Sequence, residues 1–161
     1  MSTRASTTMC LATALLAIAA CADAETEPPV ANDEALAPVP FDPNALAGRE
    51  WRLVALPGPD EVPVPPGTHA MLRFDAQPDG TWSAAGYGPC NQVGSPVVFT
   101  GGSLELVRLA SSKRACAELA LETAWFERMR GGKAAATLDG NRLELARDGV
   151  AVMVFEAGPV D

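Results

Sequence analysis

Short apolar segments separated by turn sequences follow one another from residue 46 onward, and they limit the folds that this chain can adopt. Residues 51–56 alternate, with Trp51, Leu53 and Ala55 on one face, which is typical of a strand with one buried side. Further segments of this kind are residues 70–75, 81–86, 96–100, 103–109, 137–138, 141–146 and 150–155. The sequence therefore predicts a mainly β domain of seven or eight short strands.

Asp-Gly pairs mark the tightest turns of this domain. Asp139 and Gly140 separate two predicted strands, and Asp79 and Gly80 end a Gln-Pro-Asp-Gly turn between two others. Asp-Gly suits the backbone of a two-residue hairpin. The last segment, residues 150–155, is apolar on both faces, which favours a central or covered strand. Because closure removes exposed strand edges, we expect a small antiparallel barrel or a strongly curved sheet.

A single helix is predicted over residues 117–130. Leu121, Trp125 and Met129 recur every four residues, with Ala117 and Ala124 beside them. A Gly-Gly pair follows residue 130 and ends the pattern. We expect this stripe to pack into the core.

The N-terminus has the pattern of an export signal. The apolar run of residues 9–20 is shorter than the about 20 residues that a membrane-spanning helix needs, and it suits a signal peptide. Residues 18–21 (Ile-Ala-Ala-Cys) resemble the lipobox of bacterial lipoproteins, in which the cysteine is acylated and becomes the new N-terminus. Residues 1–20 are thus a predicted lipoprotein signal peptide and Cys21 a lipid anchor. Ordinary secretion, with cleavage after the Ala-Asp-Ala of residues 22–24, is the alternative.

A lipid anchor at Cys21 would place the domain in the cell envelope. Two or three acyl chains hold a protein on a membrane firmly, at about 0.8 kcal/mol per buried methylene. By resemblance to bacterial lipoprotein sorting, Ala22 favours the outer membrane, facing the periplasm, over the inner membrane.

Residues 21–45 are acidic and rich in Pro and Ala, with Phe41 as the only aromatic residue. Such a stretch buries too little apolar area to offset its ordering entropy, so a disordered tether is predicted. Residues 46–157 then form the one domain that a chain of 161 residues allows.

The chain carries 20 acidic against 12 basic residues, a net charge of −8. This balance argues against binding to nucleic acid, which requires basic surface, and against electrostatic docking to anionic lipid. We expect a monomer.

Two cysteines remain once Cys10 leaves with the signal and Cys21 takes lipid. In an oxidising compartment Cys90 and Cys116 favour a disulfide. Two buried thiols and a reactive Cys90 are the alternatives. His69 is the one histidine. With the two cysteines it gives fewer ligands than a zinc site needs, and it has no evident partner that would orient it as a catalytic base for either cysteine.

Two other features suggest binding only weakly. Asp75 and Asp79 lie close together but lack the ligand series of a calcium loop. Residues 57–68 form a proline-rich loop, which is either a stiff surface loop or a polyproline ligand for an aromatic groove. No metal and no cofactor is expected.

The surroundings of Cys90 and Cys116 resemble a known family. Residues 86–94 (Gly-Tyr-Gly-Pro-Cys-Asn-Gln-Val-Gly) are similar to the glycine-cysteine-asparagine signature of the META domain, the family of HslJ-like envelope proteins. Residues 111–118 resemble its second signature, residues 46–53 its usual start, and residues 143–145 with Phe155 its last hairpin. The residues that carry the resemblance are Gly48, Trp51, Gly86, Cys90, Asn91, Gly94, Ala115 and Cys116.

The resemblance implies a lipocalin-like antiparallel barrel with one helix, and no reaction or shared catalytic residue. Gly86 and Gly88 suit tight backbone geometry, and Asn91 suits a turn in which its side chain bonds the nearby backbone.

The first functional hypothesis is a non-enzymatic envelope lipoprotein whose META-like domain binds a protein or envelope component, in a stress-related role. A carrier of a small apolar ligand is the second hypothesis, and it requires an internal cavity. A barrel filled by Trp51, Phe74, Trp82 and Phe155 would contradict it. The third is an inhibitor of a periplasmic or cell-wall enzyme that acts through the loop of residues 57–68.

Overall fold

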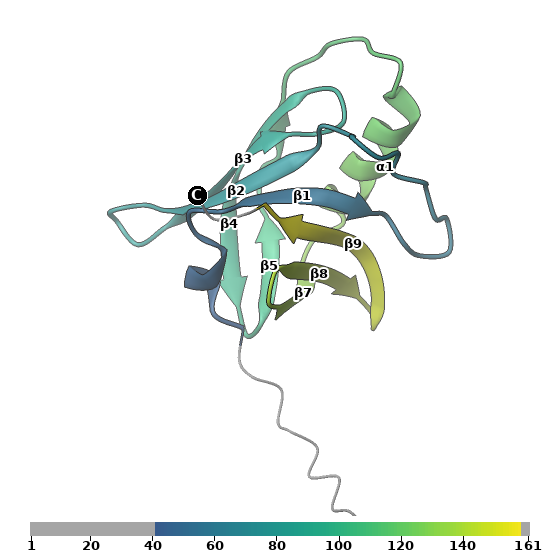
Figure 1. Cartoon of the computed structure of the whole chain (residues 1–161). Helices are drawn as coiled ribbons and strands as arrows, with labels where there is room; N and C mark the ends of the chain where they lie inside the picture. The colour runs from purple at the N-terminus through teal and green to yellow at the C-terminus, as the bar shows by residue number, and fades with distance from the viewer. Residues whose placement is uncertain (1–40, 159–161) are drawn as a thin grey trace, which may run out of the picture. The chain divides into compact units, whose positions relative to one another are not determined.

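The computed structural model describes residues 41–158 (Figure 1). The predicted signal peptide, Cys21 and residues 21–40 of the predicted tether lie outside the described residues. Residues 41–45 were also assigned to the tether, and this assignment is wrong. Pro43–Leu46 form a short 3-10 helix, η1, and the Phe41 ring lies 5.8 Å from that of Phe99. The folded domain therefore begins earlier than expected, because Phe41 and Leu46 pack against the core.

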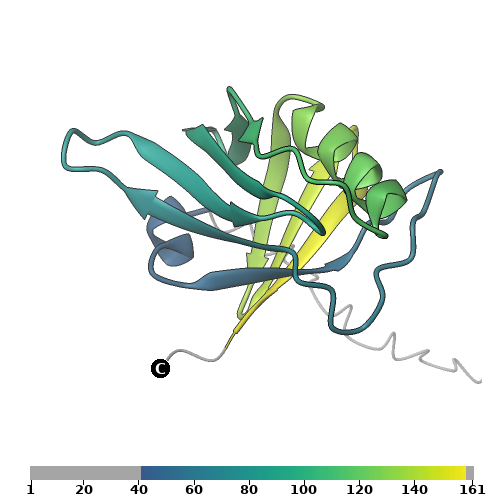
Figure 2. The ribbon, with the colours of Figure 1, turned by 90° about the horizontal axis from the view of Figure 1, so that it is seen from above.

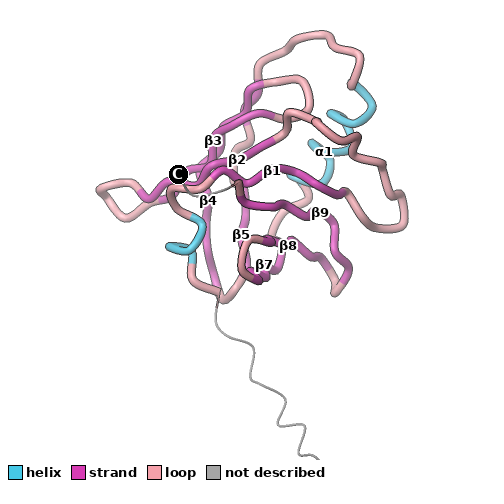
Figure 3. Tube along the Cα trace, viewed as in Figure 1, coloured by secondary structure: helices cyan, strands magenta, loops and turns pink. Residues whose placement is uncertain are grey.

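Eight antiparallel strands close into a barrel. The described residues form nine strands, of which all but β6 belong to the barrel: β1 (Glu50–Ala55), β2 (Met71–Ala76), β3 (Trp82–Tyr87), β4 (Gln92–Thr100), β5 (Ser103–Leu106), β6 (Ala110–Ser111), β7 (Ala134–Asp139), β8 (Arg142–Arg147) and β9 (Val150–Ala157). The neighbours run β3-β2-β1-β9-β8-β7-β5-β4, and pairing of β3 with β4 closes the ring. The short strand β6 pairs with the first part of β4, on the same edge as β5. The strands of the barrel are labelled in Figures 1 and 3. The predicted antiparallel barrel with one α-helix is confirmed.

Hairpin turns lie where the Asp-Gly pairs predicted them. The turns at Gly80 and Gly140 adopt positive φ, and the strands on either side pair in register. Strand β9 lies between β1 and β8, so its central position is confirmed. It is buried on both faces only from Met153 to Phe155, and Val150 is exposed.

Strand β4 starts at Gln92, four residues before the prediction. Its buried face carries Val93, Ser95 and Val97, and a serine and a proline in the middle of the segment weaken the strand pattern. The Ser95 hydroxyl bonds the carbonyl of Pro96, which satisfies a polar group on the buried face.

Other element boundaries also differ from the predictions. Strand β5 ends at Leu106 instead of residue 109, and β7 starts at Ala134, whose small side chain gave little signal. The helix α1 (Leu119–Arg130) starts two residues late. Ala117 is exposed and does not belong to the buried stripe.

The helix α1 covers one end of the barrel (Figure 2). Leu121, Trp125 and Met129 enter the core as the stripe predicts. Arg147, at the end of β8, donates to the carbonyls of Arg128 and Gly132 and so closes the C-terminus of the helix. Burial lowers the pKa of Arg147. In the described part of the chain no helix is long and apolar enough to cross a membrane.

Side chains fill the barrel interior. Trp51, Phe74 and Phe155 are almost fully buried in one continuous apolar cluster, and Trp82 packs against its edge. The Trp51 indole donates to the carbonyl of Leu46, 3.0 Å away, which ties η1 to the core. This packing contradicts the carrier hypothesis, which needed a ligand cavity inside the barrel.

Close backbone approach, not positive φ, explains Gly86. A Cβ built there would lie 2.1 Å from the carbonyl oxygen of Met71, on the neighbouring strand. By contrast, a Cβ at Gly94 would meet its nearest atom, the carbonyl oxygen of Ala84, at 3.9 Å. The first glycine of the signature therefore permits the β2–β3 pairing, whereas Gly94 is not required in this way.

We expect Gly86→Ala to destabilise the domain, because β2 and β3 must separate to admit the methyl group. The cost should be about 1–3 kcal/mol or more, as for other overpacked sites. Urea unfolding of Gly86→Ala and of the matched control Gly94→Ala measures it. Equal midpoints for the two variants would contradict the steric account.

Candidate functional site

Cys90 and Cys116 form a disulfide, with their Cα atoms 6.1 Å apart. The bond joins the turn between β3 and β4 to the segment that leads into α1. Since it closes a loop of 26 residues, it stabilises the fold by about 3.5 kcal/mol in the chain-entropy model. The predicted pairing is confirmed, and both the reactive Cys90 and the zinc set are excluded because neither thiol is free.

A buried carboxylate lies beside this disulfide. Glu122 on α1 is only 3% exposed. One of its oxygens accepts the backbone N–H of Cys90, and the other accepts the side-chain amide of Asn91, both at 3.0 Å. A buried carboxylate needs such partners, because water no longer solvates it. Gly88 makes room for it, since a Cβ there would lie 2.6 Å from the Glu122 carboxylate.

Asn91 extends the network to the second cysteine segment. Its side-chain oxygen accepts the backbone N–H of Arg114 at 2.7 Å and the hydroxyl of Ser112 at 2.9 Å. We expected the Asn91 side chain to bond backbone close to it in sequence. It does bond backbone, but that of Arg114, which is more than twenty residues away in sequence. Glu122, Asn91 and the disulfide thus hold residues 111–116 in place beside the helix.

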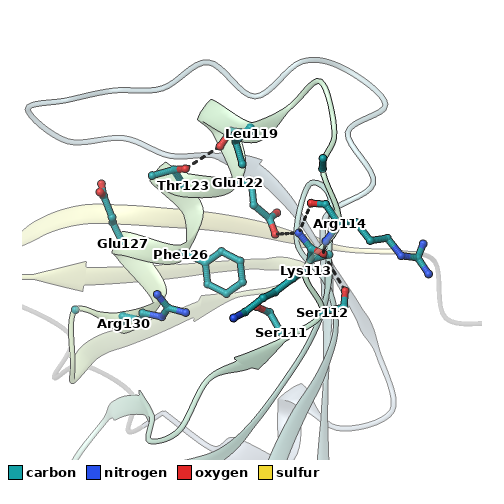
Figure 4. A pocket seen from close by; sticks show the side chains of 13 residues that line it. Ser111, Ser112, Lys113, Arg114, Leu119, Glu122, Thr123, Phe126, Glu127 and Arg130 are labelled. Carbon is teal, nitrogen blue, oxygen red and sulfur yellow. Dashed lines mark hydrogen bonds between the residues drawn. The ribbon is translucent and has the colours of Figure 1, made fainter.

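An open groove of about 790 Å³ runs along this framework (Figure 4). One wall is the extended segment of residues 111–115. The other is the face of α1 that carries Leu119, Thr123, Phe126 and Arg130. Asn91 and Glu122 also border the groove, so the rigid network forms part of its base.

The groove combines apolar surface with three basic and two acidic side chains, namely Lys113, Arg114, Arg130, Glu122 and Glu127. Leu119 is 57% exposed, and Phe126 is half-buried. The guanidinium of Arg130 lies 4.8 Å from the centre of the Phe126 ring. The Lys113 side chain extends past Phe126 toward Arg130, whereas the guanidinium of Arg114 points away from the helix (Figure 4).

The structure brings together only part of the predicted site. Cys90, Asn91, Ala115 and Cys116 lie at the groove or directly behind it. Gly86 and Gly94 support the adjacent strands, and Gly48 and Trp51 lie at the start of β1, with Gly48 in a left-handed turn. Cys21 is outside the described residues.

The remaining candidates do not gather into a site. The His69 ring packs 5.1 Å from that of Tyr87. The carboxylate of Asp79 accepts hydrogen bonds from the hydroxyl and the backbone N–H of Thr81. These bonds hold the pKa of Asp79 below its usual value and give the residue a structural role in the turn. Within residues 41–158 no three His, Cys, Asp or Glu side chains cluster as a metal site would require.

The proline-rich loop of residues 57–68 is tied to the domain. Val62 and Val64 pack against the core, and Arg128 donates to the carbonyl of Asp60 at 2.6 Å. This bond explains why Arg128 interrupts the apolar stripe of the helix.

Sequence reasoning missed Glu122, Phe126, Lys113 and Arg130 as site residues. An acidic residue in the first turn of a helix is favourable on electrostatic grounds alone, so Glu122 gives no direct sign of a buried role. Its position next to Leu121 and three residues before Trp125, on the edge of the buried stripe, was the available signal. The groove residues come from two separate elements, so no local pattern could join them.

Removal of the Glu122 carboxylate should destabilise the domain through its two partners. Glu122→Ala leaves the part-buried N–H of Cys90 without an acceptor and the amide of Asn91 with only its 3.4 Å bond to the carbonyl of Arg114, at a cost of about 1–3 kcal/mol. Urea unfolding of Glu122→Ala, Asn91→Ala and the double variant should show coupling of about 0.5–3 kcal/mol. Glu127→Ala, an exposed glutamate on the same helix, is the control and should change stability by less than about 0.5 kcal/mol. Additive effects would show that the network does not act as a unit.

Comparison with known proteins identifies the fold and the family. The family model of the META domain matches residues 44–159. An NMR structure of a protein from Burkholderia xenovorans is similar, with a TM-score of 0.58 and 23% identity over 82% of this chain and 99% of that one. A second NMR structure has a TM-score of 0.53 and 21% identity, and covers 72% of this chain and 94% of its own. No significant match exists among curated proteins. Since the matched residues make up well over half of the chain, the chain belongs to the META domain family.

Proposed function

We propose that this chain is a non-enzymatic lipoprotein of the cell envelope whose META domain binds a protein or another envelope component, in a stress-related role. The observation that supports it most is the groove between residues 111–115 and α1. A disulfide and a buried network hold both of its walls, and its surface carries Phe126, Leu119 and two cationic side chains.

Burial of this apolar surface would favour a bound partner. Each square ångström of apolar surface removed from water contributes about 25 cal/mol. An apolar patch bordered by charges is typical of interaction sites on soluble domains. Because both walls are held in place before binding, little conformational entropy is lost when a partner docks.

Anchoring at Cys21 completes the proposal. The acylated cysteine would hold the domain on the outer membrane, facing the periplasm, with residues 22–40 between the anchor and the folded part. Inhibition of a periplasmic or cell-wall enzyme is one form that such binding would take. The loop of residues 57–68 remains its candidate element, although no contact favours this loop over the groove.

Replacement of the anchor tests the localisation. We expect Cys21→Ala to move the protein from the membrane to the soluble periplasmic fraction and to abolish incorporation of labelled palmitate, because the lipobox then lacks the thiol that is acylated. Cys10→Ala is the matched control and should behave as the unmodified chain. Membrane fractionation with lipid labelling measures both variants, and a Cys21→Ala protein that keeps lipid would contradict the anchor.

A photo-crosslinking amino acid placed in the groove tests the binding site in intact cells. We expect Thr123, which lines the groove, to give a crosslinked product when replaced, and Gln77, at the distant β2–β3 turn, to give none. Lys113→Glu with Arg130→Glu should lower the Thr123 product about tenfold or more, equivalent to about 1.4 kcal/mol. If the double variant gave as much Thr123 product as the unmodified chain, the partner would bind at another surface.

A further inference from the structure

We propose that the occupant of the groove is an extended acidic peptide segment that adds as a strand to the free edge of residues 110–115. This inference rests on the proposed function, because it names the class of partner for the same groove.

The backbone of residues 112–114 presents a free edge to the groove. The N–H of Ser112 donates to the carbonyl of Gln92, and the N–H of Arg114 donates to the side chain of Asn91, so both point toward β4. Successive residues of an extended chain point in opposite directions. The N–H and C=O of Lys113 therefore face the groove, and neither has a hydrogen-bond partner within residues 41–158.

The neighbouring strand leaves this edge uncovered. Strand β7 pairs with β5 only at Ser103 and Leu104, and α1 takes its place further along. A peptide that lay between residues 110–115 and α1 would supply the missing hydrogen-bond partners. This is strand addition to an exposed sheet edge, a common mode of peptide recognition.

The dimensions of the groove suit a short peptide. Residues 111–115 span about 13 Å if extended, and α1 is about 16 Å long between Leu119 and Arg130. These lengths correspond to about four or five residues of an extended peptide. Phe126 lies along this path, where it would contact an apolar side chain of the peptide (Figure 4).

The charges select an acidic peptide. Lys113 and Arg130 flank Phe126. Two glutamates also border the groove. Both oxygens of Glu122 already accept hydrogen bonds from Cys90 and Asn91, and the exposed side chain of Glu127 points away from residues 111–115 (Figure 4). Neither cation forms an ion pair within residues 41–158, and on a chain with a net charge of −8 they favour carboxylates on the ligand.

An extended peptide fits these observations better than a lipid does. The groove is open to solvent and the barrel interior is filled, so an acyl chain would stay partly exposed to water. A free backbone edge, moreover, offers hydrogen bonds that a peptide backbone matches and an acyl chain does not.

Selection of random octapeptides displayed on phage, against the full chain carrying Cys21→Ala, tests the inference. The enriched peptides should alternate apolar with acidic residues. Lys113→Glu with Arg130→Glu should weaken their binding about tenfold or more, measured by fluorescence polarisation. The control is Arg142→Glu. Arg142 is the first residue of β8, at the opposite end of the strand from Arg147, which contacts the helix, so this change should alter binding less than twofold.

Two variants at one position isolate the backbone bond. Lys113→Ala removes the charge, and Lys113→Pro removes the charge and the N–H. Thermal unfolding verifies that both variants fold. We expect Lys113→Pro to bind the enriched peptides at least about fivefold more weakly than Lys113→Ala, because strand addition uses this donor.

The outcomes separate this inference from the proposed function. Three results would overturn the peptide assignment. They are equal peptide binding by the two Lys113 variants, a selection that enriches no peptide, and phosphatidylglycerol vesicles that bind and compete for the groove. None of these results would affect the proposed function, which is tested by the crosslink at Thr123 in cells. Absence of that crosslink would overturn the proposed function.

Discussion

The buried carboxylate of Glu122 is the interaction on which the arrangement around the helix depends. A carboxylate that is 3% exposed is stable only with good hydrogen-bond donors, and here they come from Cys90 and Asn91. Asn91 in turn holds Arg114, so one buried charge fixes three segments that are distant in sequence. The disulfide adds a covalent link between two of them. Partial loss of such a network costs more than the sum of its bonds suggests, because the remaining polar groups stay buried.

The filled barrel directs any binding to the outer surface. Large aromatic side chains occupy the interior, with Trp51 and Phe155 fully buried. The helix covers one end, and Trp51 ties η1 to the core. A barrel of eight strands is just wide enough for side chains to fill it, so this outcome follows from strand number and residue size together. The groove exists because α1, and not a further strand, stands beside the edge of residues 110–115.

The sequence predicted what depends on local patterns. Hairpins at Gly80 and Gly140, the stripe of Leu121, Trp125 and Met129, and the pairing of two remaining cysteines all follow from residue type and spacing. It failed where tertiary contacts override local signals. The start of β4 was predicted too late, because Ser95, a serine on the buried face, interrupts the apolar alternation. Phe41 joins the core from a proline-rich segment, because its ring packs against that of Phe99 on β4, a residue distant in sequence. The role of Glu122 was invisible because its partners lie more than thirty residues away.

The family signature and the groove chemistry belong to different residues, and this separation has a consequence. Gly86, Cys90, Asn91 and Cys116 permit the strand pairing and hold the walls. Lys113, Phe126 and Arg130 contribute charge and apolar surface to the groove. Phe126 and Arg130 lie outside the segments that resemble the family, and Lys113 lies within the second signature segment without being one of the residues that carry the resemblance. The resemblance to the META family therefore concerns mainly the framework, whereas the proposed docking rests on Lys113, Phe126 and Arg130. Structures with 21–23% identity share the fold alone, so two such proteins need not share a ligand.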